Sequence, residues 1–327
     1  MAKLLVDQRD QKFVLHEVLE IEELFRTDRF GHLSKGMVDA SLDAAHQLAL
    51  KEFYPIMMEA DKEGCRLENG SVHVPRCYHR LKEHFESGGW PSLYTQREYG
   101  GQGFPLSLWA SLYESFMHNC GFMWIWSTPF SATFLIEKFG TDDQKARYLT
   151  KLASGKWGSA LAIHEDACGS DIGMQTCVAV RQPDGSFRIK GVKNPVTCGD
   201  SDLFENLIHL VCARIEGDPE NETGISMFLV PKFPVQADGS LGSRNDVVPI
   251  GVERKLGVRG NPTCEVAYGK NGGCWAELLG EERQGLAMTF QVLNIAEAVL
   301  YQKCASPGGQ PRHRHPERGP VPYGHKR

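Results

Sequence analysis

The sequence has no run of apolar residues long enough to cross a membrane, and its first dozen residues carry charges where a secretory signal would be apolar. We therefore expect a cytoplasmic protein without a membrane span. A strong excess of one charge is also missing, since the formal net charge is -5 at pH 7. This balance gives no electrostatic reason to expect nucleic acid or an anionic membrane as a partner.

Close pairs of cysteines are missing as well, because the ten cysteines include no CxxC motif. Zinc sites and disulfide frameworks usually show such spacing, so we interpret the cysteines as free thiols and predict no metal site. The chain also lacks a Walker loop, an HExxH motif, a GxSxG elbow and a dinucleotide fingerprint behind a strand. The sequence therefore contains none of the motifs that usually indicate nucleotide hydrolysis, zinc-protease chemistry or a nicotinamide Rossmann domain.

The 327 residues, 41% hydrophobic and 24% charged, have the composition of a globular protein with two domains or three small ones. Apolar residues recur at helical spacing through the first half of the chain, which predicts a mostly helical region. Helices are expected within residues 13–25, 37–60, 106–118, 130–139 and 144–153.

After Trp157 the pattern changes to alternation and short apolar runs, which predict strands. The strands are expected within residues 186–193, 207–215, 224–231 and 264–269, with a hairpin turn at 183–186. Helical spacing returns from Gly285 to Leu300. Beyond Ala305 the chain is rich in Pro, Gly, Arg and His and has hardly any aliphatic side chains, so a disordered tail is expected.

Several separated segments carry a family likeness. Residues 90–105 (WPSLYTQREYGGQGFP), 139–171, 184–202 and 255–269 (KLGVRGNPTCEVAYG) occur in an order and at separations that resemble the acyl-CoA dehydrogenase family. Residues 9–25 and 224–248 resemble the branch that contains 3-methylmercaptopropionyl-CoA dehydrogenase-like proteins. The likeness covers about residues 1 to 296, and agreement between separated motifs is more specific than any one motif.

The resemblance implies an α+β multidomain fold with an N-terminal all-α domain, a β-barrel-like middle domain and a truncated C-terminal helical bundle. The expected parts are an N-terminal extension helix (1–34), the helical domain (35–156), the middle β domain (157–282), the start of the C-terminal helical domain (283–301) and the tail (302–327). We interpret the abrupt change in composition as a premature end or a shifted reading frame, with an authentic evolved tail as the alternative.

The implied activity is FAD-dependent α,β-dehydrogenation of an acyl-CoA thioester, of short or medium chain length or 3-methylthiopropanoyl-CoA. Such chemistry needs a flavin as hydride acceptor, an oriented thioester and a carboxylate base. We assign no catalytic residue, because the family's base is expected in the C-terminal domain. An electron-transfer flavoprotein is the implied electron acceptor, and a homo-oligomer is expected. The alternative is a non-catalytic remnant or scaffold that binds acyl-CoA weakly or pairs with an intact paralogue.

The first segment implied to contact the cofactor matches the family's TEPxxGSD-like motif. Ile163, His164, Glu165 and Gly169 fall at positions near FAD, and Ser170 matches a residue that contacts the acyl-CoA. Gly169 would allow close backbone approach, and Ser170 is able to donate a hydrogen bond. His164 replaces the hydroxyl residue that usually bonds the flavin, and a histidine that only ends a strand is an equal alternative.

The second segment implied to contact FAD consists of Pro195, Val196 and Thr197. Thr197 keeps the family's hydroxyl group. Pro195 stands where the family usually has an aromatic ring on the isoalloxazine, so stacking worth about 0.5 to 1.5 kcal/mol beyond area burial is lost together with a backbone N–H. We therefore expect weakened FAD binding.

Overall fold

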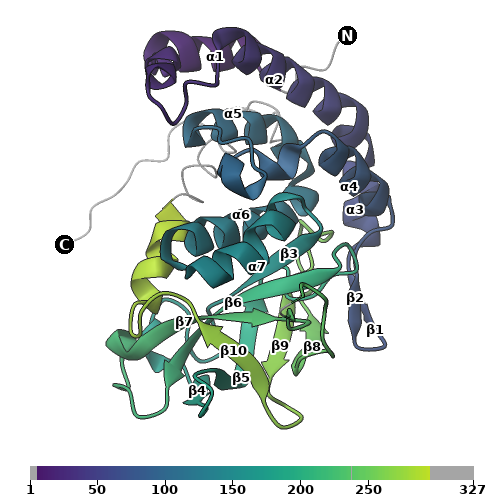
Figure 1. The fold of residues 1–327 in the computed structure, drawn as a ribbon. Helices are drawn as coiled ribbons and strands as arrows, with labels where there is room; N and C mark the ends of the chain where they lie inside the picture. Colours follow the sequence, from purple (N-terminus) through teal and green to yellow (C-terminus); the bar gives the residue numbers. More distant parts are fainter. Residues whose placement is uncertain (1–5, 237, 295–327) are drawn as a thin grey trace, which may run out of the picture.

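The computed structural model describes residues 6–236 and 238–294, which form a helical region above a β domain (Figure 1). A hairpin of β1 (Arg66–Glu68) and β2 (Ser71–His73) interrupts the helices and extends from them. The helices are α1 (Gln8–Phe13), α2 (Lys35–Leu48), α3 (Tyr54–Glu63), α4 (Cys77–Ser87), α5 (Leu106–Phe116), α6 (Cys120–Phe139) and α7 (Asp142–Ala153). A π-helical turn at Ala49–Phe53 joins α2 to α3.

The single helix predicted over residues 13–25 is not present. The chain passes from α1 into a π-helical turn (Val14–Val18) and then, beyond a break, into a 3-10 helix (Ile21–Arg26). The break is at Glu20, which has a positive φ of 46° and so cannot continue a right-handed helix. Of the predicted apolar face, Val18 and Leu19 are more than half exposed, whereas Ile21 is buried.

Helix α6 begins ten residues earlier than predicted. It contains Pro129, a residue that usually interrupts a helix. Proline has no N–H to donate to the carbonyl four residues earlier, here that of Ile125. The hydroxyl of Thr128 lies 2.9 Å from this carbonyl oxygen and shares its one proton between it and the carbonyl oxygen of Ser159. Most of α6 is buried, so its packing also holds the helix together.

The β domain confirms the predicted barrel-like fold. The strands are β3 (Trp157–Ala162), β4 (Val178–Arg181), β5 (Phe187–Val196), β6 (Asn206–Ile215), β7 (Ile225–Pro231), β8 (Val247–Val252), β9 (Cys264–Tyr268) and β10 (Cys274–Leu278). The strands β10, β7, β6, β4 and β5 pair in this order, and β10 pairs again with β5, so five strands form a closed ring. The predicted hairpin turn joins β4 to β5, with Gly185 at φ 83°.

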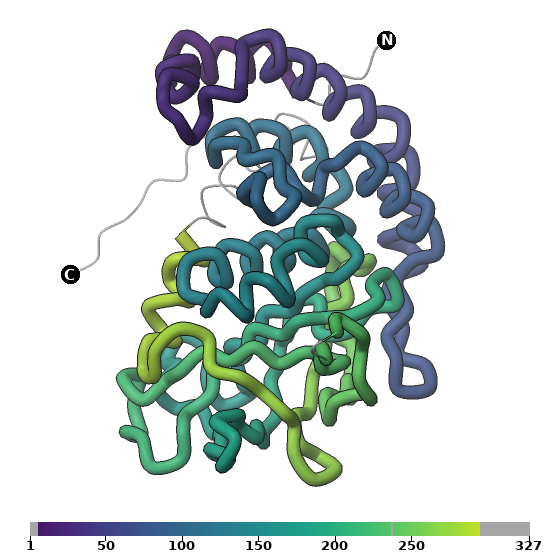
Figure 2. The backbone as a smooth tube through the Cα atoms, in the orientation of Figure 1, coloured from purple at the N-terminus to yellow at the C-terminus, as the bar shows by residue number. Residues whose placement is uncertain are grey.

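Helices α6 and α7 lie between the other helices and the barrel (Figures 1 and 2). The hydroxyl of Thr128 lies 2.6 Å from the carbonyl oxygen of Ser159, and the hydroxyl of Ser159 donates to the carbonyl of Thr128 at the same distance. These reciprocal contacts fix β3 against α6. The direction in which the chain leaves β3 is therefore set by the helical layer.

The described part of the last predicted helix, residues 285–294, is helical. Met288 and Val292 are buried, whereas Phe290 is 54% exposed and Leu293 37%. The ammonium of Lys138 on α6 donates to Oε1 of Gln291, which places this helix beside α6. Residues 295–300 of the predicted helix and the predicted tail lie outside the described residues.

Candidate functional site

The first predicted segment leaves β3 as a tight turn. The N–H of Glu165 donates to the carbonyl of Cys168, and the N–H of Cys168 donates back to that of Glu165. Ile163 and Glu165 are buried, whereas His164 and the residues on the outside of the turn, Gly169 and Ser170 among them, are exposed. The turn therefore presents its backbone to the surface while it is anchored from within.

The anchor is the ammonium of Lys193 on β5, which is fully buried. It donates three hydrogen bonds, to the carbonyl of Ile163 (2.9 Å), to Oε1 of Glu165 (3.0 Å) and to Oε1 of Gln175 (2.7 Å). An ammonium has three donors, so none is left without a partner. Through these bonds the buried ammonium of Lys193 positions both ends of the segment from residue 163 to residue 175.

The carboxylate of Glu165 also has all its partners within the protein. It accepts from the N–H and hydroxyl of Thr176, from the N–H of Cys177 and from Lys193. Burial alone would raise the pKa of Glu165, but the charge of Lys193 and the hydrogen bonds outweigh it and lower the pKa. Glu165 is therefore an ionised structural group and not a proton acceptor poised for chemistry.

The second predicted segment lies directly against the first. The N–H of Asn194 donates to the carbonyl of His164 (2.9 Å), and the side-chain amide of Asn194 donates to Asp166 (2.8 Å). The N–H of Leu161 donates to the carbonyl of Thr197 (3.2 Å). The fold thus places the two predicted segments side by side at His164 and Asn194 and at Leu161 and Thr197, although they are about thirty residues apart in the sequence.

A β-bulge shapes this second segment. The pairing of β5 with β9 shifts by one residue between Lys193 and Val196, and Pro195 follows a cis peptide bond inside the shift. Proline is tolerated there because the bulge needs no ladder N–H. Pro195 is exposed, Thr197 is half-buried, and the side chain of Val196 is buried in the barrel core.

The imidazole of His164 carries no hydrogen bond to any described residue. Partial burial, followed by the charge of Lys193, lowers the pKa of His164. The ring is therefore neutral at physiological pH and has one N–H donor and one nitrogen acceptor. This state suits a hydrogen bond to a neutral heterocycle better than an ion pair.

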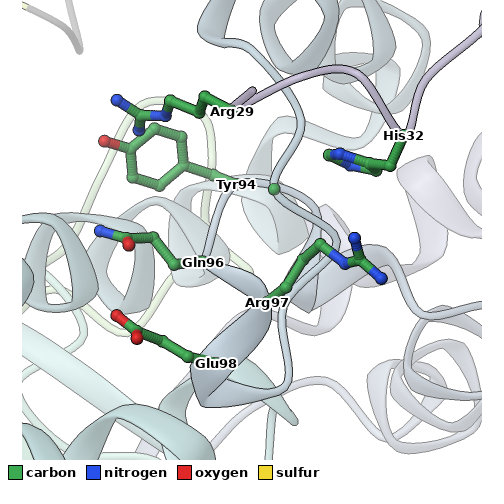
Figure 3. Close-up of a pocket in the computed structure, with 7 residues that line it drawn as sticks. Arg29, His32, Tyr94, Gln96, Arg97 and Glu98 are labelled. Carbon is green, nitrogen blue, oxygen red and sulfur yellow. The ribbon is translucent and has the colours of Figure 1, made fainter. Parts of the chain in front are cut away.

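The predicted residues do not line either of two surface pockets. One pocket, of about 350 Å³, is lined by Arg29, His32, Tyr94, Gln96, Arg97, Glu98 and Gly103. Figure 3 shows the Arg29 guanidinium beside the ring of Tyr94, with His32 and Arg97 on the other side of the space. The second pocket lies on the barrel surface between β5, β8 and β10. Of Gly100, Gly101 and Gly103, only Gly103 lines the first pocket. No motif in the sequence predicted the second pocket.

Within the described ranges, no three His, Cys, Asp or Glu side chains are placed to hold a metal ion. The nine described cysteines are all free thiols. Burial raises the pKa of Cys177 to about 12, so its thiol is un-ionised at neutral pH. The described helices include none with the length and apolar character to span a membrane.

Known proteins are similar to this chain in sequence and in fold. Residues 39–156 match the acyl-CoA dehydrogenase N-terminal domain. The 3-methylmercaptopropionyl-CoA dehydrogenase of Ruegeria pomeroyi is 33% identical over 295 residues, which are 89% of this chain and 49% of that protein. The chain belongs to the acyl-CoA dehydrogenase family. A broad-specificity linear acyl-CoA dehydrogenase of Mycobacterium tuberculosis is 31% identical over 90% of this chain and 49% of its own length.

The acyl-CoA dehydrogenase fold is also seen by structural comparison. An acyl-CoA dehydrogenase from Bacillus anthracis, solved in complex with FAD, aligns with a TM-score of 0.66 at 22% identity, over 82% of this chain and 41% of that chain. The present chain spans about half the length of the curated relatives it matches. The two segments joined by Lys193 therefore lie in a fold shared with flavin-binding relatives.

Proposed function

We propose that this chain acts as an FAD-dependent acyl-CoA dehydrogenase that oxidises the Cα–Cβ bond of an acyl-CoA thioester. The observation that carries the proposal is the junction of residues 163–170 with residues 193–197, which the Lys193 ammonium braces in a family member. The proposed substrates are 3-methylthiopropanoyl-CoA and other short or medium acyl-CoA thioesters. We further propose an electron-transfer flavoprotein as acceptor and a homo-oligomeric enzyme.

The residues at this junction fit the polar edge of a flavin. The hydroxyl of Thr197, the imidazole of His164 and the backbone N–H groups of Gly169 and Ser170 have no partner among the described residues. A Cβ placed on Gly169 would meet nothing within 4 Å, so the space above its backbone is open. When bound, FAD would supply the hydride acceptor.

The protein's own contribution is positioning. Thr197 and His164 would hold the flavin through hydrogen bonds, and Ser170 would donate one to the acyl-CoA. Pro195 offers an exposed apolar surface without an aromatic ring, which supports weak retention of FAD. Glu165 is not proposed as the α-proton base, because four hydrogen bonds hold its carboxylate.

The test is to purify the chain, add FAD, remove free FAD and record the flavin spectrum. Partial retention of FAD is expected, with a flavin spectrum that bleaches on anaerobic addition of 3-methylthiopropanoyl-CoA or butyryl-CoA. Thr197→Val should weaken FAD retention by roughly 2- to 13-fold, the equivalent of one hydrogen bond of about 0.5 to 1.5 kcal/mol. Thr150→Val, at an exposed position on α7, is the matched control and should leave retention unchanged.

The two halves of the proposal are separable. A folded chain that retains FAD but is not bleached by either thioester would contradict the dehydrogenase activity and favour the scaffold. A folded chain that never retains FAD would contradict the cofactor assignment as well. If Thr197→Val and Thr150→Val change FAD retention equally, Thr197 does not contact FAD.

A further inference from the structure

A polar pocket of about 560 Å³ lies on the outer surface of the barrel. Its walls come from β5, β8, β10, the loop before β8 and the turn between β9 and β10. The lining includes two arginines, Arg188 and Arg244, and one large aromatic ring, Trp275. This combination of groups is the starting point of the inference.

Arg188 and Trp275 are direct cross-strand partners in the β5–β10 pairing. Side chains paired in this way leave the sheet on the same face and lie about 5 Å apart at their Cβ atoms. Arg188 is exposed and has no ion-pair partner among the described residues. A guanidinium without a carboxylate partner thus stands beside a half-buried indole.

The side chain of Asn245 holds the backbone of Trp275. Asn245, which is 8% exposed, accepts from the N–H of Trp275 (2.9 Å) and donates to its carbonyl (2.8 Å). Asn245 also donates to the carbonyl of Pro231 (3.0 Å), so the loop before β8 is fixed to β10. Arg244, the next residue back, is steadied by a hydrogen bond to the carbonyl of Gly70 (3.1 Å). The second guanidinium therefore lies on a braced loop.

The only carboxylate lining this pocket is already occupied. Asp246 accepts from the N–H of Asn271 (2.6 Å), from its side-chain amide (2.8 Å) and from the N–H of Gly273 (3.3 Å). These bonds shape the turn between β9 and β10, where Gly272 has a φ of 126° and a Cβ there would meet nothing within 4 Å. The carboxylate of Asp246 thus directs its oxygens into the turn and not towards the two guanidinium groups of the pocket. The backbone of Gly272 is open, so a ligand is able to approach it closely.

We propose that this pocket binds a nucleoside monophosphate, with the base against Trp275 and the phosphate between Arg188 and Arg244. Guanidinium groups pair with phosphate oxygens in a bidentate manner, and an aromatic side chain stacks on any base. The site is independent of the proposed flavin site. Arg188 and Pro195 lie seven residues apart on β5, roughly 23 Å at about 3.3 Å per residue.

The test is calorimetric titration of the whole chain with AMP, adenosine and inorganic phosphate. AMP should bind, and adenosine and phosphate should each bind at least tenfold more weakly, because each supplies half of the contacts. Arg188→Gln and Arg244→Gln should each weaken AMP binding about tenfold. Arg181→Gln, at an exposed arginine on β4 outside the pocket, is the matched control and should stay within twofold of the original chain.

Trp275→Leu should weaken AMP binding while leaving phosphate binding unchanged, which separates stacking from charge. Urea unfolding of each variant checks that the variant is folded. If Trp275→Leu does not fold, the two arginine variants alone decide the proposal. The proposal is overturned if AMP shows no binding up to about 1 mM. It is equally overturned if adenosine or phosphate binds as tightly as AMP, or if Arg181→Gln weakens binding as much as Arg188→Gln.

Discussion

The ammonium of Lys193 lies 3.0 Å from Oε1 of Glu165, and both side chains are buried between β5 and the turn that follows β3. Removing one partner of such a pair leaves the other charged and buried. Lys193→Met should therefore lower the free energy of unfolding by about 3 to 5 kcal/mol, measured by urea denaturation. Lys190→Met, at an exposed lysine on the same strand, should change it by less than about 0.5 kcal/mol.

The double variant Lys193→Met with Glu165→Gln should be more stable than Lys193→Met alone, because no unpaired charge remains. A single variant that costs less than about 1 kcal/mol would show that the pair does not brace the segment.

The buried imidazole of His209 predicts a pH dependence. Burial, followed by the charge of Lys232, lowers the pKa of His209 to about 3. The unfolded chain binds this proton near its ordinary pKa of about 6.5, so the stability contributed by His209 is complete above that pH. Stability should fall as the pH drops from about 6.5 towards 3, by up to about 1.4 kcal/mol per pH unit. Urea denaturation at several pH values in this window measures the slope.

His209→Gln should flatten that slope, because glutamine binds no proton in either state. His79→Gln is the control at an exposed histidine and should keep the original slope. Identical slopes in the two variants would mean that another group is responsible for the acid sensitivity.

A substitution at Gly169 should affect cofactor binding but not folding. A Cβ at this position would meet nothing within 4 Å of protein, so Gly169→Ala should leave the free energy of unfolding within about 0.5 kcal/mol of its original value. If the flavin approaches this backbone as proposed, the same methyl group should reduce FAD retention several-fold. Gly36→Ala, at an equally open position on α2, should leave retention unchanged. Full retention by the Gly169 variant would argue against close approach there.

The hydroxyl of Thr128 supports α6 at its proline and joins α6 to β3. Thr128→Val keeps the shape of the side chain but removes these contacts, and it should cost about 1 to 3 kcal/mol of stability by urea denaturation. Thr150→Val on the exposed face of α7 should have almost no effect. Equal stability of the two variants would show that packing alone holds α6 on the barrel.

Local periodicity predicted the helical segments that contain α2, α3, α5 and α7 and the strands β5, β6, β7 and β9. The prediction did not include α4, the β1–β2 hairpin or the strands β3, β4, β8 and β10. It placed the start of α6 at residue 130, whereas the helix begins at Cys120 and continues through Pro129, a residue that usually interrupts a helix. It joined residues 13–25 into one helix because apolar spacing does not reveal the positive φ of Glu20.

The candidate site followed from motifs in the sequence, but its construction did not. Lys193 gave no signal, since a lysine in an alternating strand ordinarily faces water. Lys193 continues the inward-facing phase of Phe187 and Ile189 on β5, and its buried charge is accommodated by acceptors that residues far along the chain supply. The cross-strand pair of Arg188 and Trp275 depends in the same way on a register that only the folded barrel sets.

The pairing of β5 with β10 has a practical consequence for shortened versions of this protein. A fragment that ends before Cys274 would leave the start of β5 and the middle of β7 with backbone donors and acceptors facing solvent. Such uncovered edges recruit strands from neighbouring molecules. Expression boundaries placed inside the barrel should therefore yield precipitates, whereas a cut beyond Leu279 keeps the ring shut.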